Sequence, residues 1–374
     1  MRNTTISICK ALAIILMVAG HAECPAALSK FLFEFHMPVF FATAGYFFSL
    51  KYLNDEATFV KKRLRGLYLP FLKWSVFFLI IHNTMFRLGI LNEQYGNAAG
   101  GVTHPYTWHQ IQQNLWTMVT AMGGYDQFLC GAFWFFRALL VTSILYLIIY
   151  KGLHHLTKRL HRPPHPLTVP IAICLLMLLL GAWKTAEGIK IVTIVQGGYR
   201  EIMGTFFFGC GFLFRQLQPK YRPSWWGTIV FAAIVWLFSE YYPSNMGWRA
   251  TFEQFVRLPL PAVCGILLIY NVSTVLDRHD NLIRRFLVYC GDHTLYIFVF
   301  HILAFKAVNP LKIWYYQLDW AQMGCHLVIH HHSADDYFWL LYTLAGVALP
   351  LLGYWGYTQV WPRLHSKLTG QRND

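Results

Sequence analysis

Four ionisable residues lie within apolar stretches near the start of the chain. Lys10 and His21 belong to the run ICKALAIILMVAGH, and Glu34 and His36 belong to FEFHMPVFFATAGYF. Ionisable groups are costly in hydrocarbon, so such residues are expected to line a protein interior or a reaction site. Histidine transfers protons near neutral pH, and burial or a nearby carboxylate tunes it for that task. The pattern indicates proton-transfer chemistry.

A metal site is the competing interpretation, because histidine is a common metal ligand. The histidines of the apolar runs form no HxxxH pair, and the eight cysteines show no CxxC pair or zinc spacing. One loop offers His326 and His330 at i and i+4, followed by His331 and His332, but a solvated interfacial loop is the better interpretation. We therefore expect no metal.

The elements that position these residues are membrane-spanning helices. The chain has 374 residues, of which 56% are hydrophobic and only 13% are charged, about half the charged share of a soluble domain. Apolar runs long enough to span a bilayer recur along the whole chain. We predict an all-α integral membrane protein with ten spans, at about 5–22, 31–50, 67–87, 128–150, 167–184, 200–217, 225–242, 256–276, 284–306 and 338–358.

The loop charges predict the topology. The net charge of +14 comes from basic residues in short loops, which favours membrane topology over nucleic-acid binding. Basic residues gather in alternate connections and in the C-terminal tail, so both termini are expected in the cytoplasm. The long outer connections are 88–127 and 307–337, whose Trp and Tyr content favours an interfacial lid or a short helix. We expect one membrane domain over 1–374.

This topology places several polar residues at one depth. His21, His36, His82, Arg137 and His301 come from five predicted spans, and all fall toward the outer leaflet. The shared depth predicts one polar chamber that opens outward. Lys10 precedes His21 by eleven residues, so it lies on nearly the same helix face, about 16 Å nearer the cytoplasm.

A basic cluster precedes the third span and consists of Lys61, Lys62, Arg63 and Arg65. It is either a topology signal beside anionic lipid or a dock for a cytoplasmic polyanion. Both interpretations stay open, because one loop can serve both purposes.

Several motifs resemble those of a known family. The pair KALAIILMVAGH and FHMPVFFATAGYFF is similar to the start of the membrane acyltransferase 3 family, especially its fucose 4-O-acetylase-like branch. The segments FVKKRLRGLYLPF, FWFFRALL and CGDHTLYIFVFH resemble later family patterns in the expected order. The resemblance implies a ten-helix protein of the bacterial-type inner membrane. Such a protein moves an acyl group, usually acetyl, from cytoplasmic acyl-CoA to a glycan hydroxyl.

The resemblance also implies roles for single residues. The family's catalytic histidine falls on His21, and its basic residue eleven positions earlier, commonly arginine, is Lys10 here. Lysine keeps the charge but lacks the bidentate fork of arginine. The remaining family positions correspond to His36, Arg63, His301 and an aromatic motif that begins at Trp134.

These residues suggest a direct transfer. His21 is the expected general base, oriented by Glu34 or His36, and Arg137 or His36 would stabilise the oxyanion. Lys10 and the basic cluster would guide acyl-CoA, and a further set of residues would contact the acceptor, namely Trp134, His301 and His82. The expected partners are a glycan or lipid-linked sugar and membrane lipids. No Ser or Cys stands in a convincing triad, so no covalent enzyme intermediate is expected.

Two other classes of function remain open. Buried His and Lys could relay protons in a transporter or flippase. That class is often built from inverted repeats or matching broken helices, and the sequence shows neither. A role as a membrane sensor or scaffold would not explain why the histidines of several spans share one depth.

Overall fold

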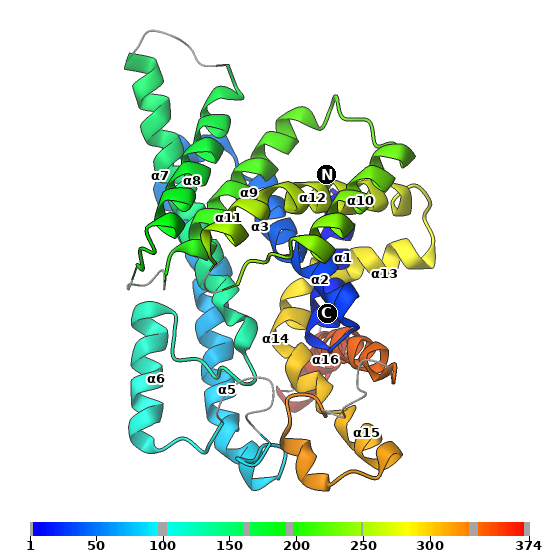
Figure 1. Cartoon of the computed structure of the whole chain (residues 1–374). Helices are drawn as coiled ribbons and strands as arrows, with labels where there is room; N and C mark the ends of the chain where they lie inside the picture. Colours follow the sequence, from blue (N-terminus) through cyan, green and yellow to red (C-terminus); the bar gives the residue numbers. More distant parts are fainter. Residues whose placement is uncertain are drawn as a thin grey trace.

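The computed structural model describes residues 3–95, 103–159, 165–191, 197–247, 250–328 and 336–369, with side chains described as far as residue 360. All regular secondary structure in these ranges is helical (Figure 1). The predicted all-α class is confirmed.

Seven helical stretches within the described residues are long and apolar enough to cross a membrane. They are Thr4–His21, Glu56–Arg87, Gly131–Arg159, Thr168–Ala186, Phe252–Leu276, Thr294–Tyr316 and Phe338–Val360. In terms of elements, they comprise α1 (Thr4–His21), α4 (Glu56–Arg63), α5 (Leu69–Arg87), α7 (Trp134–Arg159), α8 (Thr168–Ala186), α11 (Phe252–Arg257), α12 (Pro259–Leu276), α14 (Thr294–Phe305), α15 (Asn309–Tyr316) and α16 (Phe338–Thr369). These stretches correspond to seven of the ten predicted spans.

The other three predicted spans differ from a long uninterrupted apolar helix for separate reasons. The helix α10 (Trp225–Tyr241) is apolar but has only 17 residues. The helix α9 (Tyr199–Leu217) carries three charged residues, Arg200, Glu201 and Arg215. The predicted span 31–50 is broken into α2 (Ala26–Phe33) and α3 (His36–Tyr46).

The break between α2 and α3 has a local cause. Pro38 is the third residue of α3. A proline ring clashes with the carbonyl four residues earlier in a continuous helix, and here that carbonyl belongs to Glu34. The chain therefore turns at Glu34 and Phe35 before α3 begins. The predicted span 284–306 is also divided, at His293, into α13 (Leu282–Asp292) and α14.

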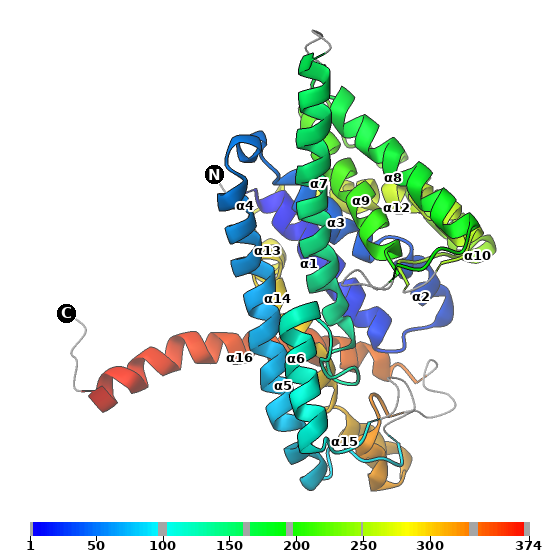
Figure 2. The ribbon, with the colours of Figure 1, turned by 90° about the vertical axis from the view of Figure 1, so that its left-hand side faces the viewer.

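A long helical rod spans the height of the molecule. The helix α4, a π-helical turn at Leu64–Tyr68 and α5 follow one another without a break. Figure 2 shows this rod beside α7, with α4 at one end and α6 (Trp108–Ala121) and α15 at the other. The helix α6 confirms the short helix predicted in connection 88–127. In the same view, α16 projects sideways from the body.

Glycines allow the central helices to approach closely. A Cβ at Gly45 of α3 would overlap the backbone of Phe208, and a Cβ at Gly211 of α9 would overlap the backbone of Ala42. Helices in membranes associate through small residues of this kind, because packing replaces the hydrophobic driving force. This close packing fixes α3, which carries His36, against α9.

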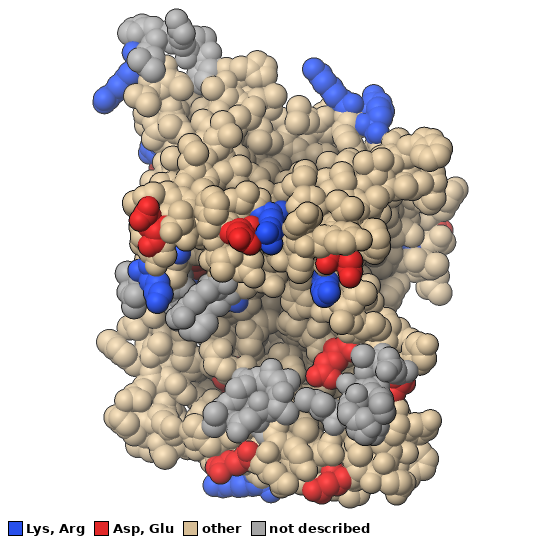
Figure 3. All heavy atoms as spheres, in the orientation of Figure 1, with Lys and Arg blue, Asp and Glu red and all other residues tan. Residues whose placement is uncertain are grey.

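The outer surface agrees with a membrane setting. Charged side chains are few on the face shown in Figure 3, which is covered mainly by uncharged residues. Exposed apolar side chains include Ile80 and Leu179, each with 70% of its surface accessible. Such contiguous apolar surface is typical of protein that faces lipid.

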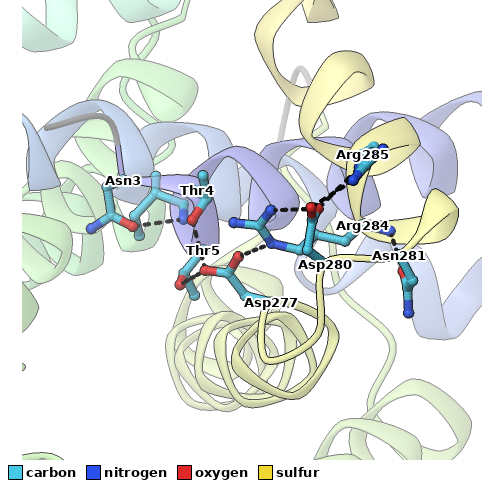
Figure 4. A network of polar contacts seen from close by, with 9 residues as sticks. Asn3, Thr4, Thr5, Asp277, Asp280, Asn281, Arg284 and Arg285 are labelled. Carbon is cyan, nitrogen blue, oxygen red and sulfur yellow. Dashed lines mark hydrogen bonds and ion pairs between the residues drawn. The ribbon is translucent and has the colours of Figure 1, made fainter.

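A polar network anchors the start of α1 to the corner between α12 and α13 (Figure 4). Thr4 and Thr5 donate hydrogen bonds to Asp277, at 2.8 and 2.6 Å, and Arg284 donates to the same carboxylate at 2.7 Å. Partial burial raises the pKa of Asp277, but the hydrogen bonds from Thr5, Arg284 and Thr4 together outweigh it and hold the pKa below its usual value. The network fixes the end of the helix that carries Lys10 and His21.

Candidate active site

A cavity of about 690 Å³, counting its open mouth, lies between α1, α3, α7, α9 and α14. Its polar lining consists of His21, His36, Arg200 and Asn245, and Trp134 adds an aromatic surface. The remaining lining residues are apolar. The part of this space that water-sized molecules can fill is about 240 Å³, just below the range of about 300–1,000 Å³ that small-molecule sites occupy. The cavity brings together three of the predicted site residues, His21, His36 and Trp134.

The tautomer of His21 follows from its contact with His301. His301 Nδ1 lies 2.9 Å from the carbonyl oxygen of Phe298 and 3.2 Å from that of Ile297. Carbonyl oxygens only accept, so Nδ1 carries the proton, and Nε2 of the neutral ring is an acceptor. His21 Nδ1 lies 2.9 Å from that Nε2 and must be the donor. The Nε2 of His21 therefore keeps a lone pair, on a ring that lines the cavity.

His36 is held in the same tautomer. Its Nδ1 lies 2.8 Å from the carbonyl oxygen of Leu32 and donates to it. The ring is 4% exposed, and its Nε2 is free to act as an acceptor, or as a donor once protonated. Because α3 begins at His36, the break between α2 and α3 is what places this ring at the cavity.

Glu34 contacts a short segment rather than His21. It accepts hydrogen bonds from the backbone N–H of Ser244 at 2.7 Å and from its hydroxyl at 3.0 Å. Residues 244–247, which we call the strap, follow α10, and the last three of them line the cavity. The sequence predicts that Glu34 or His36 orients His21. In the structure His301 contacts His21, and Glu34 holds the strap.

The start of α9 holds the rest of the strap. Tyr199 donates from its hydroxyl to the carbonyl of Asn245 at 3.0 Å. Arg200 donates from Nε to the carbonyls of Met246 and Gly247, at 3.2 and 3.3 Å. The two residues fix the strap through its backbone, and the side-chain oxygen of Asn245 accepts a further hydrogen bond from the Gly247 N–H at 2.7 Å.

Arg200 is a cavity residue that the sequence reasoning missed. Its guanidinium carbon lies 3.8 Å from the ring centroid of Trp134, which is a stacked cation–π contact. Arg200 begins the predicted span 200–217, at the outer end of that span. The depth argument applied to the histidines would have placed it at the same level.

Arg137 and His82 lie outside the cavity lining. Arg137 is one turn beyond Trp134 on α7, is 2% exposed, and donates from Nη1 to the carbonyl of Met122 at 3.4 Å. His82 is fully buried, with Nδ1 2.6 Å from Asp126 and Nε2 2.9 Å from the carbonyl of His104. The contacts of His82 tie α5 to the connection 88–127, and the contact of Arg137 ties α7 to it.

The residues of the basic cluster differ in exposure. Arg63 is partly buried, and its guanidinium lies over the rings of Phe59 and Phe208, at 5.0 and 5.9 Å from their centroids. The other three members are exposed, namely Lys61, Lys62 and Arg65. Lys10 is partly buried on α1 and does not line the cavity. A charged surface is thus presented at the α4 end of the rod.

The described residues hold no group of three or more His, Cys, Asp or Glu placed to bind a metal ion. His326 packs edge-on against Phe128 and Phe305. Burial, with smaller contributions from His21 and Lys306, lowers the pKa of His326 to about 3. The histidines expected beside it, His330 to His332, lie outside the described residues. All eight cysteines are free thiols.

Comparison with known proteins supports an enzymatic site. A family model described as an acyltransferase domain matches residues 3–357, nearly the whole chain. Comparisons with curated proteins and with solved structures give no match. The matched region contains every residue that lines the cavity, including His21 and Arg200. The chain belongs to the acyltransferase 3 family.

Proposed function

We propose that this protein is a multi-pass membrane enzyme of the bacterial-type cytoplasmic membrane. It moves an acyl group, with acetyl as the first choice, from acyl-CoA to a hydroxyl of a cell-envelope or exported glycan. The observation that carries the proposal is the free Nε2 lone pair of His21, fixed through His301 on a ring that lines the cavity. Family membership supports the acyl-transfer chemistry.

In the proposed reaction, His21 Nε2 accepts the proton of the acceptor hydroxyl as its oxygen attacks the thioester carbonyl. The carbonyl oxygen becomes an oxyanion beside His36, which lines the same cavity at the positive end of α3. The tetrahedral intermediate collapses with cleavage of the C–S bond. The His21 imidazolium then returns its proton to the CoA thiolate, so the products are the ester and free CoA.

The donor enters from the side of the basic cluster. The CoA phosphates are anionic, and the exposed Lys61, Lys62 and Arg65 offer countercharge at the α4 end of the rod. Lys10 lies on α1 between that end and His21, so it extends the positive path toward the cavity. This arrangement requires the N-terminus and α4 to face the cytoplasm.

A direct test uses purified protein in lipid nanodiscs, acetyl-CoA with a labelled acetyl group, and a glycan extract from the envelope of a bacterial host. The wild type is expected to release free CoA and to label the glycan. His21→Ala is expected to lose both activities, whereas His109→Ala changes an exposed residue of α6 and should retain them. Full glycan labelling by His21→Ala would remove His21 from the mechanism. A transporter would release no CoA with either protein.

A further inference from the structure

We propose that the acceptor carries an anionic group, a carboxylate or a phosphate, and that Arg200 binds this group beside His21. The inference rests on the proposed function, since it names the chemical class of the acceptor. It starts from the observation that the cavity has a cation in its wall that the proposed transfer does not use.

The guanidinium of Arg200 is held ready for a ligand. Nε is bound to two carbonyls of the strap, and the planar group lies 3.8 Å from the ring centroid of Trp134. These contacts fix its position before any ligand arrives. Among the described residues, Nη1 and Nη2 have no hydrogen-bond partner. A guanidinium with two free nitrogens matches the paired oxygens of a carboxylate or phosphate.

The electrostatics of the cavity favour an anion. No Asp or Glu belongs to its lining. Glu34 lies between α2 and α3, and its carboxylate is occupied by two hydrogen bonds from Ser244. Glu201 follows Arg200 directly, is 3% exposed and lies outside the lining. Its charge interacts with Arg200 but is shared with Arg137 and Lys184, and it makes no ion pair with Arg200 within 4 Å. Bringing a cation to a membrane-embedded cavity is costly unless a counterion compensates it. An anionic ligand supplies that counterion.

The position of Arg200 assigns this role to the acceptor rather than the donor. Arg200 begins α9, next to the strap and to the first residue of α7. In the proposed topology this is the outward side of the cavity, whereas the donor arrives along α1 from the basic cluster.

The test measures binding of three probes, glucuronate, glucose 1-phosphate and glucose, to the full-length protein in nanodiscs. The wild type is expected to bind at least one anionic probe about 10- to 100-fold more tightly than glucose, as a charge-assisted pair of hydrogen bonds predicts. The two anionic probes distinguish carboxylate from phosphate recognition. Equal or undetectable binding of all three probes would overturn the proposal.

Three variants separate ligand binding from support of the strap. Arg200→Gln is expected to lose the preference for the anion, and Arg200→Lys to keep part of it. Tyr199→Phe removes one contact to the strap but keeps the guanidinium, so it should retain the preference. An equal loss in Tyr199→Phe and Arg200→Gln would show that Arg200 only holds the strap. Thermal unfolding of each variant confirms that it is folded.

The same measurements keep this proposal distinct from the proposed function. His21→Ala should abolish acyl transfer but leave the preference for the anionic probe unchanged. If the wild type binds the anion but transfers no acyl group, the acyltransferase proposal fails while the anion site stands. If it transfers acyl groups but shows no preference, only the anion site fails.

Discussion

Replacing His301 tests whether its ring fixes the reactive tautomer of His21. In the structure, His301 Nε2 accepts the Nδ1–H of His21 at 2.9 Å. His301→Leu removes this acceptor, so the Nδ1–H tautomer of His21 loses the interaction that favours it. A buried donor without its partner costs about 1–3 kcal/mol. Applied to the barrier, that cost corresponds to a decrease in kcat of about 5- to 150-fold.

The assay measures CoA release and glycan labelling under saturating acetyl-CoA, so that the change appears in kcat rather than in KM. His301→Gln is the matched control, because its amide oxygen can accept the same hydrogen bond and should restore part of the rate. If His301 had only a structural role, kcat would fall equally in both variants, and their thermal stability would fall in parallel. If His301→Leu is stable and retains the wild-type kcat, the argument from the tautomer is wrong.

Three other predictions concern stability. The hydrogen bonds to Asp277 lower its pKa, so its carboxylate stabilises the folded state above about pH 4. This stabilisation is lost as the pH falls through the lowered pKa. The difference in melting temperature between the wild type and Asp277→Asn should therefore close in acid. Gly211→Val should lower the free energy of unfolding by about 1–3 kcal/mol, because its side chain would overlap the backbone of Ala42. Gly353→Val is the control, since there is open space around its Cβ. Equal melting temperatures of the two variants would contradict the packing argument. Asp126→Ala leaves the buried ring of His82 without its carboxylate and should cost about 1–3 kcal/mol in chemical unfolding. A changed KM with unchanged stability would instead favour acceptor binding by His82.

The sequence predicted the class of fold better than the course of single helices. Hydropathy identifies long apolar runs such as Thr4–His21, since one property is averaged over the whole run. It does not identify the break before His36, because the residues on both sides of the break are equally apolar. The cause is a single proline, Pro38, whose effect depends on backbone geometry rather than on hydropathy.

The candidate site was predicted in part for a similar reason. His21, His36 and Trp134 share a cavity, and His301 contacts His21, so depth along the helices was a useful guide. Depth does not specify which way a side chain points. Arg137 lies one turn from Trp134 on the same helix, yet its guanidinium donates to the carbonyl of Met122 and does not line the cavity.

The strap could not be predicted by periodicity at all. It is an irregular segment, and its position depends on contacts with residues distant in sequence, such as Glu34, which precedes Ser244 by 210 positions. Only a three-dimensional structure brings these two residues together. The sequence alone suggests His21 as a partner for Glu34 because the two residues are close in the chain.

The break before α3 also changes which backbone groups the cavity can offer. An unbroken membrane helix has its amides paired internally, so it presents no free N–H at this depth. The helix α3 begins with His36 and Met37, which both line the cavity, and its N-cap residue, Phe35, makes no side-chain capping bond. The positive end of the α3 dipole points the same way. A negative charge that forms near His36 in the proposed transfer would be stabilised by this dipole, and that contribution depends on the break before Pro38.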